Sequence, residues 1–400
     1  MKFMWNNIYD HFRRKTNTTA FIPQIDGLRF LAIFMVVLFH INIFVTNKIP
    51  FTFSQSAKDY WLYNFLNTDR KGVLLFFVIS GFILALPFIK ESFGQEKPVE
   101  LKKYYLRRLT RLEPPYFLVM IASFLGVLLL PSHGFISESS RTFANLFPSL
   151  AASLVYLHNL IFSQNLSLNP VAWSLEIEVQ FYLIVPLLVR VFKFSPVVRR
   201  TILSTAILGF VFLQHQIKPG FYSLYNYIQY FLLGLLLADL YLSQIRVKIN
   251  FWLAIFLGLI SLGFIWLADV RTSPYVECLF VAFVFMLYFL ALTCEAWIKV
   301  FSIRPLVIIG GMCYTIYLLH YNLISLVGNK TIFFNVSRSY PAAYLWHSLI
   351  LIPIILLVSA VFYLLIERPC MDKDWPVKLW RWVKNLINKK TPPPVVFMQN

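Results

Sequence analysis

The stretch DGLRFLAIFMVVLFH, residues 26–40, is a run of hydrophobic side chains with an arginine near its start and a histidine at its end. Together with the apolar residues that follow, it is long enough to cross a bilayer as an α-helix. An ionisable side chain inside such a helix is costly unless it faces a bundle interior or a water-filled cavity. Arg29 and His40 are therefore the first candidates for function in this chain.

The rest of the chain shares the apolar character of this stretch. Of 400 residues, 58% are hydrophobic and only 14% are charged, whereas a soluble globular domain is about half apolar and about one quarter charged. The composition excludes a soluble globule and predicts an all-α fold, a polytopic membrane helix bundle of about ten transmembrane helices. The predicted spans are 28–46, 72–89, 114–130, 173–192, 201–214, 224–243, 251–268, 276–297, 305–328 and 344–366.

The distribution of basic residues sets the expected orientation. With the N-terminus in the cytoplasm, 27 of the 36 Lys and Arg residues lie in predicted inner segments and 9 in outer ones, as the positive-inside rule requires. The net charge of +18 is thus a topology signal and an attraction to anionic membrane lipids, and it requires no nucleic acid. We expect a cytoplasmic segment at 1–25, one membrane domain at 26–369 and a basic cytoplasmic tail at 370–400.

Two further patterns limit the architecture. Residues 146–162 are apolar enough to be an eleventh span, but a crossing there would invert every later loop, so we predict a re-entrant or interfacial segment. The four cysteines show neither CxxC spacing nor a Cys/His ligand pattern, so the sequence predicts no disulfide framework and no metal site.

Arg29 and His40 are predicted to share one face of their helix. Eleven residues at 100° per residue come within about 20° of three full turns, and they rise about 16 Å. Arg29 then lies at the inner end of the span, and His40 lies beyond the bilayer midplane. The alternative for each residue is a purely structural role, as a headgroup-level arginine and a hydrogen-bonded core histidine.

Other polar groups are expected at the depth of His40. The motif WSLEIEVQFY opens the span at 173 from the outer side, which places Trp173, Ser174 and Glu178 in the outer half of the membrane. The stretch YTIYLLH, which contains Tyr317, ends at His320, again past the middle of its span. A carboxylate beside an imidazole in low dielectric would fix its tautomer and raise its basicity, as a general base for a hydroxyl requires. The alternative is that Glu178 only holds helices together.

The predicted inner surface carries a complementary group of charges. Arg108 and Arg111 are i, i+3 neighbours just before Pro114, at the membrane level of Arg29. Guanidinium groups bind phosphate oxygens bidentately, although arginines at a span boundary often serve topology alone. The pair Ser80-Gly81 within the second span would let a thin ligand approach the helix closely.

These features fit a ligand with a phosphorylated head, a long thin arm and a reactive end. Acyl-coenzyme A has this form, and a hydroxyl acceptor would approach from the outer side. Arg29, Arg108, Arg111, Ser80 and Gly81 are the predicted donor-binding residues.

The chain also resembles the acyltransferase-3 family of bacterial integral-membrane acyltransferases, from Asp26 to Pro369. No single motif is specific to this family, but the order of the motifs and their placement in the membrane are specific when taken together. The motifs that carry the resemblance are Asp26-Gly27-Leu28-Arg29 with ten residues before His40, Phe77 with Ser80-Gly81-Phe82, Arg108-x-x-Arg111, the WSLxxE pattern from Trp173 to Glu178, Tyr314 to His320, and Glu367-Arg368-Pro369.

The resemblance implies transfer of an acyl group, most often acetyl, from cytoplasmic acyl-CoA to a hydroxyl of an extracytoplasmic glycan or glycolipid, in the bacterial inner membrane. It implies that His40 is the essential histidine. On the residues we expect His40 to act as general base or as acyl relay, with Glu178 orienting or charging it. Trp173, Ser174, Tyr317 and His320 are expected to bind substrate.

The chain departs from the family pattern in two respects. The second acid that many members carry after WSLxx is Val179 in this chain, and the SGNH-type domain that many relatives carry is absent from the sequence. We therefore expect any further transfer step to need a separate protein.

Two other classes of function stay open on the residues alone. Intramembrane Arg, His and Glu also mark the paths of transporters and flippases, although we find no paired discontinuous helices in two matching halves. Buried polar groups can also serve assembly only.

Overall fold

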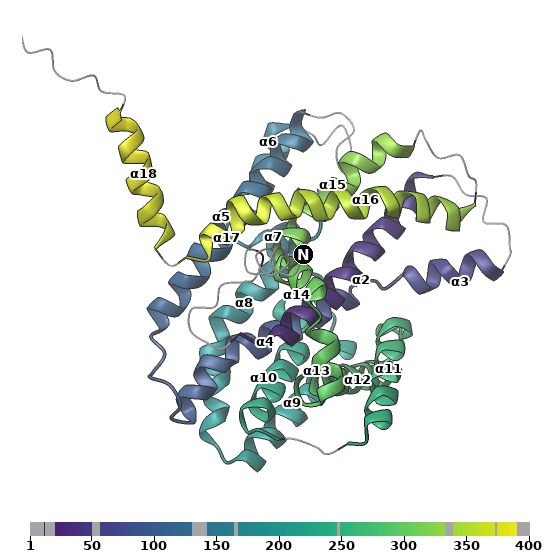
Figure 1. The fold of residues 1–400 in the computed structure, drawn as a ribbon, viewed down its shortest axis with the longest axis vertical. Helices are drawn as coiled ribbons and strands as arrows, with labels where there is room; N and C mark the ends of the chain where they lie inside the picture. The colour runs from purple at the N-terminus through teal and green to yellow at the C-terminus, as the bar shows by residue number, and fades with distance from the viewer. Residues whose placement is uncertain are drawn as a thin grey trace, which may run out of the picture.

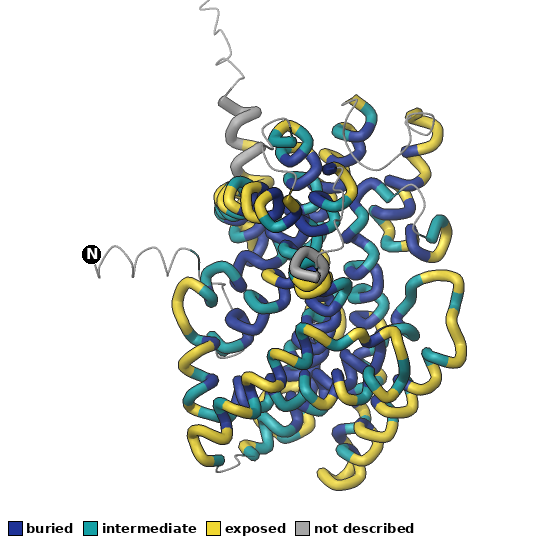
Figure 2. The backbone as a smooth tube through the Cα atoms, turned by 90° about the vertical axis from the view of Figure 1, so that its right-hand side faces the viewer, coloured by how far each residue is buried: buried dark blue, intermediate teal, exposed yellow. Residues whose placement is uncertain are grey.

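The computed structural model describes residues 12, 21–49, 57–129, 142–163, 167–245, 249–332, 339–372 and 374–389. All the regular elements in these ranges are helices, which confirms the predicted all-α bundle. Figure 2 shows buried residues in the interior of the bundle and exposed ones along its outer helices. The N-terminal segment and the basic tail are described only in part.

In the part of the chain that the structure describes, six helices are long and apolar enough to cross a membrane. They are α2 (Pro23–Lys48), α4 (Lys71–Ser92), α5 (Leu101–Leu129), α9 (Pro196–Gln216), α12 (Pro274–Thr293) and α16 (Tyr340–Phe362). Helices α14 (Arg304–Gly311) and α15 (Cys313–Thr331) meet at a 69° bend, and together they would make a seventh span.

Three of the ten predicted spans are shorter than expected. They correspond to α8 (Trp173–Leu188), α10 (Ile228–Leu242) and α11 (Phe251–Leu267). At 1.5 Å per residue these helices reach about 22–26 Å, less than the ~30 Å of a typical hydrocarbon core. Short 3₁₀ helices lengthen two of them, η2 (Val189–Lys193) after α8 and η3 (Leu224–Asn226) before α10.

The apolar segment at 146–162 is not one continuous helix. It forms α6 (Phe143–Leu154) and α7 (His158–Phe162), with a turn between them in which Tyr156 has a φ of 59°. Neither helix is long enough to cross a bilayer alone, which agrees with the prediction that this stretch is not an ordinary span.

The remaining helices are short or lie at the end of the described chain. They are α3 (Ala57–Leu66), α13 (Glu295–Phe301), the π-helix η5 (Tyr363–Glu367), α17 (Arg368–Cys370) and α18 (Trp375–Lys389). Figure 1 shows α18 running away from the other helices.

Helix α2, which begins with the stretch quoted first, lies in the interior and contacts α4, α13, α14, α15 and α16. Glycines allow its close approach to the helices beside its first turns. A Cβ on Gly27 would lie 2.0 Å from the carbonyl oxygen of Phe301, and one on Gly310 would lie 1.7 Å from that of Asp26. The motif that opens α2 is thus needed for packing as well as for its charges.

Helices α4 and α10 pack closely along their length. A Cβ on Gly81 would lie 2.2 Å from the carbonyl oxygen of Phe231, and one on Gly234 would lie 2.3 Å from that of Val78. Because a side chain at either glycine would overlap the opposite backbone, this contact fixes the position of α4, which carries Ser80.

Candidate functional site

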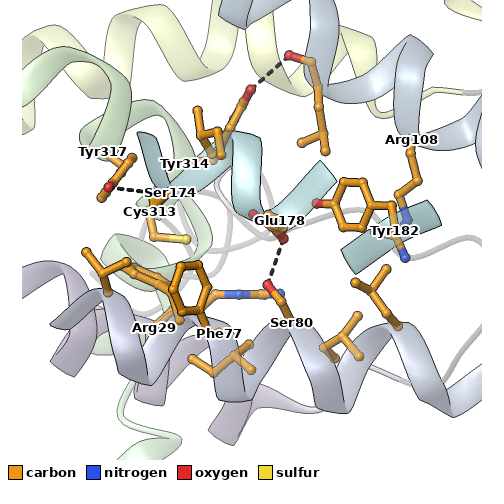
Figure 3. Close-up of a pocket in the computed structure, with 17 residues that line it drawn as sticks. Arg29, Phe77, Ser80, Arg108, Ser174, Glu178, Tyr182, Cys313, Tyr314 and Tyr317 are labelled. Carbon is orange, nitrogen blue, oxygen red and sulfur yellow. Dashed lines mark hydrogen bonds between the residues drawn. The ribbon is translucent and has the colours of Figure 1, made fainter. Parts of the chain in front are cut away.

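A cavity of about 100 Å³ lies between α2, α4, α5, α8 and α15. Apolar and polar side chains contribute about equally to its wall, and several polar groups converge on it (Figure 3). The polar and titratable residues that line it are Arg29, Ser80, Arg108, Ser174, Glu178, Tyr182, Cys313, Tyr314 and Tyr317. Buried, mixed lining of this kind is typical of a small-molecule site.

Arg29 borders the cavity from α2. It forms an ion pair with Asp26 one turn earlier on the same helix, and both side chains are buried. Figure 3 shows the guanidinium group lying beside Ser80. The acid of the DGLR motif therefore holds the arginine in place and offsets its charge within the bundle.

Glu178 borders the cavity from α8. The Ser80 hydroxyl of α4 donates a hydrogen bond of 2.7 Å to Glu178 Oε1. Figure 3 shows the Tyr182 hydroxyl turned towards the same carboxyl group. Hydroxyl donors stabilise a carboxylate that would otherwise be costly at this depth.

Arg108 borders the cavity from α5, where two tyrosine rings hold it. Its guanidinium carbon lies 5.6 Å from the ring centroid of Tyr104 and 5.7 Å from that of Tyr182. Such cation–π contacts position an arginine without neutralising its charge. Arg108 is half-buried, so its charge is available to an anionic ligand.

Ser174 and Tyr317 form another part of the wall. Their hydroxyl oxygens lie 2.6 Å apart, and the Tyr317 hydroxyl also donates to the carbonyl oxygen of Val171 at 2.9 Å. The Ser174 hydroxyl lies 3.4 Å from the same carbonyl oxygen, so either hydroxyl can be the donor in the bond between the two. This bond joins α8 to α15.

His40 and His320 form a pair that this cavity does not include. His320 Nε2 lies 3.2 Å from His40 Nδ1, and the ring centroids are 4.9 Å apart. His320 is fully buried and His40 is half-buried. The ring of Tyr317 lies 5.7 Å from that of His320, so one aromatic ring of the cavity wall contacts the histidine pair.

The hydrogen bonds of this pair define its tautomers when both rings are neutral. His40 Nδ1 lies 2.8 Å from the carbonyl oxygen of Val36, and His320 Nδ1 lies 3.0 Å from that of Ile316. Since a carbonyl oxygen only accepts, both Nδ1 atoms carry hydrogen. The single hydrogen on His40 Nδ1 is then shared between the carbonyl oxygen of Val36 and His320 Nε2, and His40 Nε2 keeps its lone pair.

The structure brings together most of the predicted site residues. Those that line the cavity are Arg29, Ser80, Arg108, Ser174, Glu178 and Tyr317. The predicted neighbour of His40 differs from the one observed, because Glu178 bonds to Ser80 whereas His40 contacts His320. His320, which was expected to bind substrate, thus lies beside His40 in the place that the sequence predicted for Glu178.

Three predicted residues lie elsewhere. Gly81 faces α10 and contributes to packing, as its close approach to Phe231 shows. Arg111 is not among the cavity-lining residues, although it follows Arg108 by less than one turn. Trp173 lies beside the cavity, with its ring 6.3 Å from that of Phe77.

Trp173 belongs to a cluster that we call the aromatic cluster, made of Trp173, Tyr222 and Tyr227 with Arg70. The Trp173 ring lies 5.2 Å from Tyr222 and 5.4 Å from Tyr227. Arg70 donates to the Tyr227 hydroxyl at 2.5 Å and lies over the Trp173 and Tyr222 rings. Trp173 and Tyr222 are both half-buried.

The sequence argument missed the tyrosines that hold the charged groups. Tyr182 follows Glu178 by four residues and Tyr104 precedes Arg108 by four, so each pair shares a helix face. That spacing was visible in the sequence. Its significance depends on α5 lying beside α8, which the sequence does not show.

Comparison with known proteins supports a catalytic role for this domain. An acyltransferase domain family, acyltransferase-3, matches residues 22–364. O-acetyltransferase OatA of Staphylococcus aureus strains NCTC 8325, COL and MRSA252 is 26% identical over 386 residues, covering 90% of this chain and 59% of the relative. The chain therefore spans about three fifths of the length of these relatives. No solved structure matches the chain significantly.

The family match covers every residue of the cavity, the histidine pair and the aromatic cluster. It also agrees with the multi-pass helical architecture. This membrane protein therefore belongs to the acyltransferase-3 family.

Proposed function

We propose that the protein is a membrane O-acetyltransferase that takes an acetyl group from cytoplasmic acetyl-CoA and transfers it to a hydroxyl of an extracytoplasmic glycan or glycolipid. The observation that carries the proposal is the pair His40 and His320 beside a cavity that holds two arginines. The family membership and the printed activity of the OatA relatives support the same reaction class.

The cavity suits the thin arm of acyl-CoA better than the whole molecule. Its volume of about 100 Å³ is smaller than the ~300–1,000 Å³ typical of sites that enclose a drug-sized ligand. The arm of coenzyme A carries amide groups. In this proposal Ser80 and Glu178 accept from amide N–H groups, and Arg29 donates to an amide carbonyl.

Arg108 would bind a phosphate of the donor. Its guanidinium group is half-buried between the two tyrosine rings, and arginine binds phosphate bidentately. Arg111 could add charge outside the cavity, as the sequence pattern predicts. The proposal assigns both residues to the cytoplasmic end of the donor.

His40 would act as the general base. Its Nε2 lone pair takes the proton of the acceptor hydroxyl while the oxygen attacks the thioester carbonyl. The new C–O bond forms, the C–S bond breaks, and the imidazolium returns the proton to the leaving thiolate sulfur. The hydrogen bond from His40 Nδ1–H to the carbonyl oxygen of Val36 and to His320 Nε2 becomes stronger as positive charge develops on the His40 ring.

The proposal requires the acyl end to pass the Tyr317 ring. Tyr317 lines the cavity on one side and contacts His320 with the same ring. A displacement of this ring, with loss of its bond to Ser174, would join the cavity to the histidine pair.

The aromatic cluster is the proposed acceptor side. Trp173 and the tyrosines offer ring faces of the kind that stack on sugars, and Arg70 adds a positive charge. Phe77 contacts both Trp173 and the cavity, so the cluster adjoins the donor site.

Mass spectrometry of envelope glycans and lipids tests this function. We expect cells that express the protein to carry acetyl groups that are missing from cells expressing His40→Ala at equal abundance. Purified protein should cleave acetyl-CoA, whereas a carrier would move substrate without cleaving the thioester. Normal acetylation by His40→Ala would refute the proposal.

A further inference from the structure

Helix α18 lies beyond residues 22–364, which the family match covers. Its sequence, WPVKLWRWVKNLINK, contains no acidic residue. At 100° per residue Trp375 and all the apolar positions after the proline, except Val377, fall within a sector of about 160°, and the basic ones fall outside that sector. The apolar positions are Trp375, Leu379, Trp380, Trp382, Val383, Leu386 and Ile387, and the basic ones are Lys378, Arg381, Lys384 and Lys389.

The helix is attached to the bundle at its first residue. The indole nitrogen of Trp375 donates to the carbonyl oxygen of Thr110 on α5 at 2.8 Å. Beyond this point α18 runs away from the other helices (Figure 1). The side chain of Leu379 is left 48% exposed and that of Trp380 is 68% exposed.

The attachment places α18 at a particular level of the membrane. Thr110 lies within the basic stretch of α5, between Arg108 and Arg111, and before the prolines at 114 and 115. The charge distribution predicts that this stretch lies at the cytoplasmic surface. The first residue of α18 is therefore at the same level.

The length and charge of α18 exclude it as a span. Fifteen residues reach about 22 Å, and four basic side chains would have to enter the hydrocarbon core. A helix with tryptophans on one side and lysines or arginines on the other is typical of segments that lie in the membrane interface. The absence of acidic residues fits a negatively charged surface.

We propose that α18 lies in the plane of the inner membrane surface and binds anionic phospholipids. Its apolar sector enters the boundary between headgroups and acyl chains. Arg381 and Lys384 contact the lipid phosphates, whereas Lys378 pairs with Asp372 at the start of the helix and adds to the positive charge there. The proposal does not rest on the acetyl transfer reaction.

Spin labels on the full-length chain in lipid nanodiscs test this placement. A nitroxide at Leu379→Cys and another at Arg381→Cys are compared in a background without the four native cysteines. Reference labels at Lys97, in an exposed loop, and at Leu208, exposed on α9, mark water and lipid. The probes are oxygen, which concentrates in lipid, and a water-soluble nickel chelate.

In nanodiscs that contain about one third phosphatidylglycerol, we expect the label at 379 to resemble the one at 208 and the label at 381 to resemble the one at 97. In pure phosphatidylcholine the label at 379 should be at least threefold more accessible to nickel. The variant K378Q/R381Q/K384Q should lose this lipid dependence. The matched variant K97Q/K102Q/K103Q, which removes three exposed charges elsewhere, should retain it.

Three results would overturn the proposal. The label at 379 could be as accessible to nickel as the one at 97 in both lipids. It could be shielded from both probes, as a protein partner or a second copy would cause. It could also enter the lipid equally in both nanodiscs, which would remove the role of anionic lipid.

Discussion

Substitution of His320 by asparagine tests the role of the histidine pair. His320 Nε2 accepts from His40 Nδ1 at 3.2 Å, and it does not line the cavity. Without the His320 imidazole, the imidazolium that forms on His40 loses one charge-assisted hydrogen bond. Such a bond contributes about 1.5–3 kcal/mol, which corresponds to a rate factor of about 10–150.

The expected loss lies at the lower end of this range. The carbonyl oxygen of Val36 still accepts from His40 Nδ1 at 2.8 Å, so the tautomer of His40 is retained. We expect His320→Asn to lower kcat about tenfold, with little change in the KM for acetyl-CoA. His320→Gln, whose side-chain oxygen can accept the same hydrogen, should recover part of the loss.

His347 provides a matched control for this substitution. It is also fully buried, and its Nδ1 bonds to the carbonyl oxygen four residues earlier, Ala343, at 2.8 Å. It contacts the ring of Phe44 and has no contact with His40 among the described residues. His347→Asn should lower thermal stability to a similar degree but leave kcat unchanged.

The assay is acetyl-CoA cleavage by detergent-purified protein, with the fraction folded measured by size-exclusion chromatography and thermal melting. Equal losses of kcat in His320→Asn and His347→Asn would refute the reasoning, because the effect would then come from packing. Wild-type kcat in His320→Asn would refute it as well.

Three further outcomes follow from the geometry. Arg108→Gln should raise the KM for acetyl-CoA about 10- to 100-fold in the same assay through loss of a charge-assisted contact, whereas Arg107→Gln, exposed and outside the cavity, should not. Gly81→Val should lower the melting temperature and the yield of folded protein, because a Cβ would lie 2.2 Å from an α10 carbonyl oxygen, whereas Gly209→Val has open space. Glu277→Leu should lower the free energy of unfolding by about 3–5 kcal/mol, measured by denaturation in detergent. The Glu277 carboxylate accepts hydrogen bonds of 2.5–2.9 Å from four side chains, which would lose their acceptor: Gln214, His215, Gln229 and Tyr230. An unchanged KM in Arg108→Gln would contradict the first prediction, and an unchanged melting temperature in Gly81→Val would contradict the second. An unchanged free energy of unfolding in Glu277→Leu would contradict the third.

The sequence predicted the features that depend on local periodicity. The long apolar runs gave the positions of the helices. The eleven-residue spacing placed Arg29 and His40 on one face of α2, and each occupies a polar environment in the interior. Local spacing also marked Arg108, Ser174 and Glu178, which the fold brings to one cavity.

The pairing of distant groups could not be predicted in the same way. His40 and His320 are separated by 280 residues, and Ser80 and Glu178 by 98. Which polar group meets which depends on helix packing, and glycine contacts such as Gly81 with α10 set that packing. Depth alone suggested Glu178 as the neighbour of His40, but the packing of α15 beside α2 puts His320 there.

The central claim is that an acetyl group passes from a donor on one side of the membrane to an acceptor hydroxyl on the other, with His40 as the general base. Proteoliposomes of known orientation, loaded with radiolabelled acetyl-CoA on the cytoplasmic side and given an envelope glycan outside, measure this directly. We predict that label appears on the outer glycan with the wild-type protein and is absent with His40→Gln, compared at equal amounts of folded protein and at saturating donor. Equal labelling by both proteins would contradict the account, as would labelling only when donor and acceptor share one side.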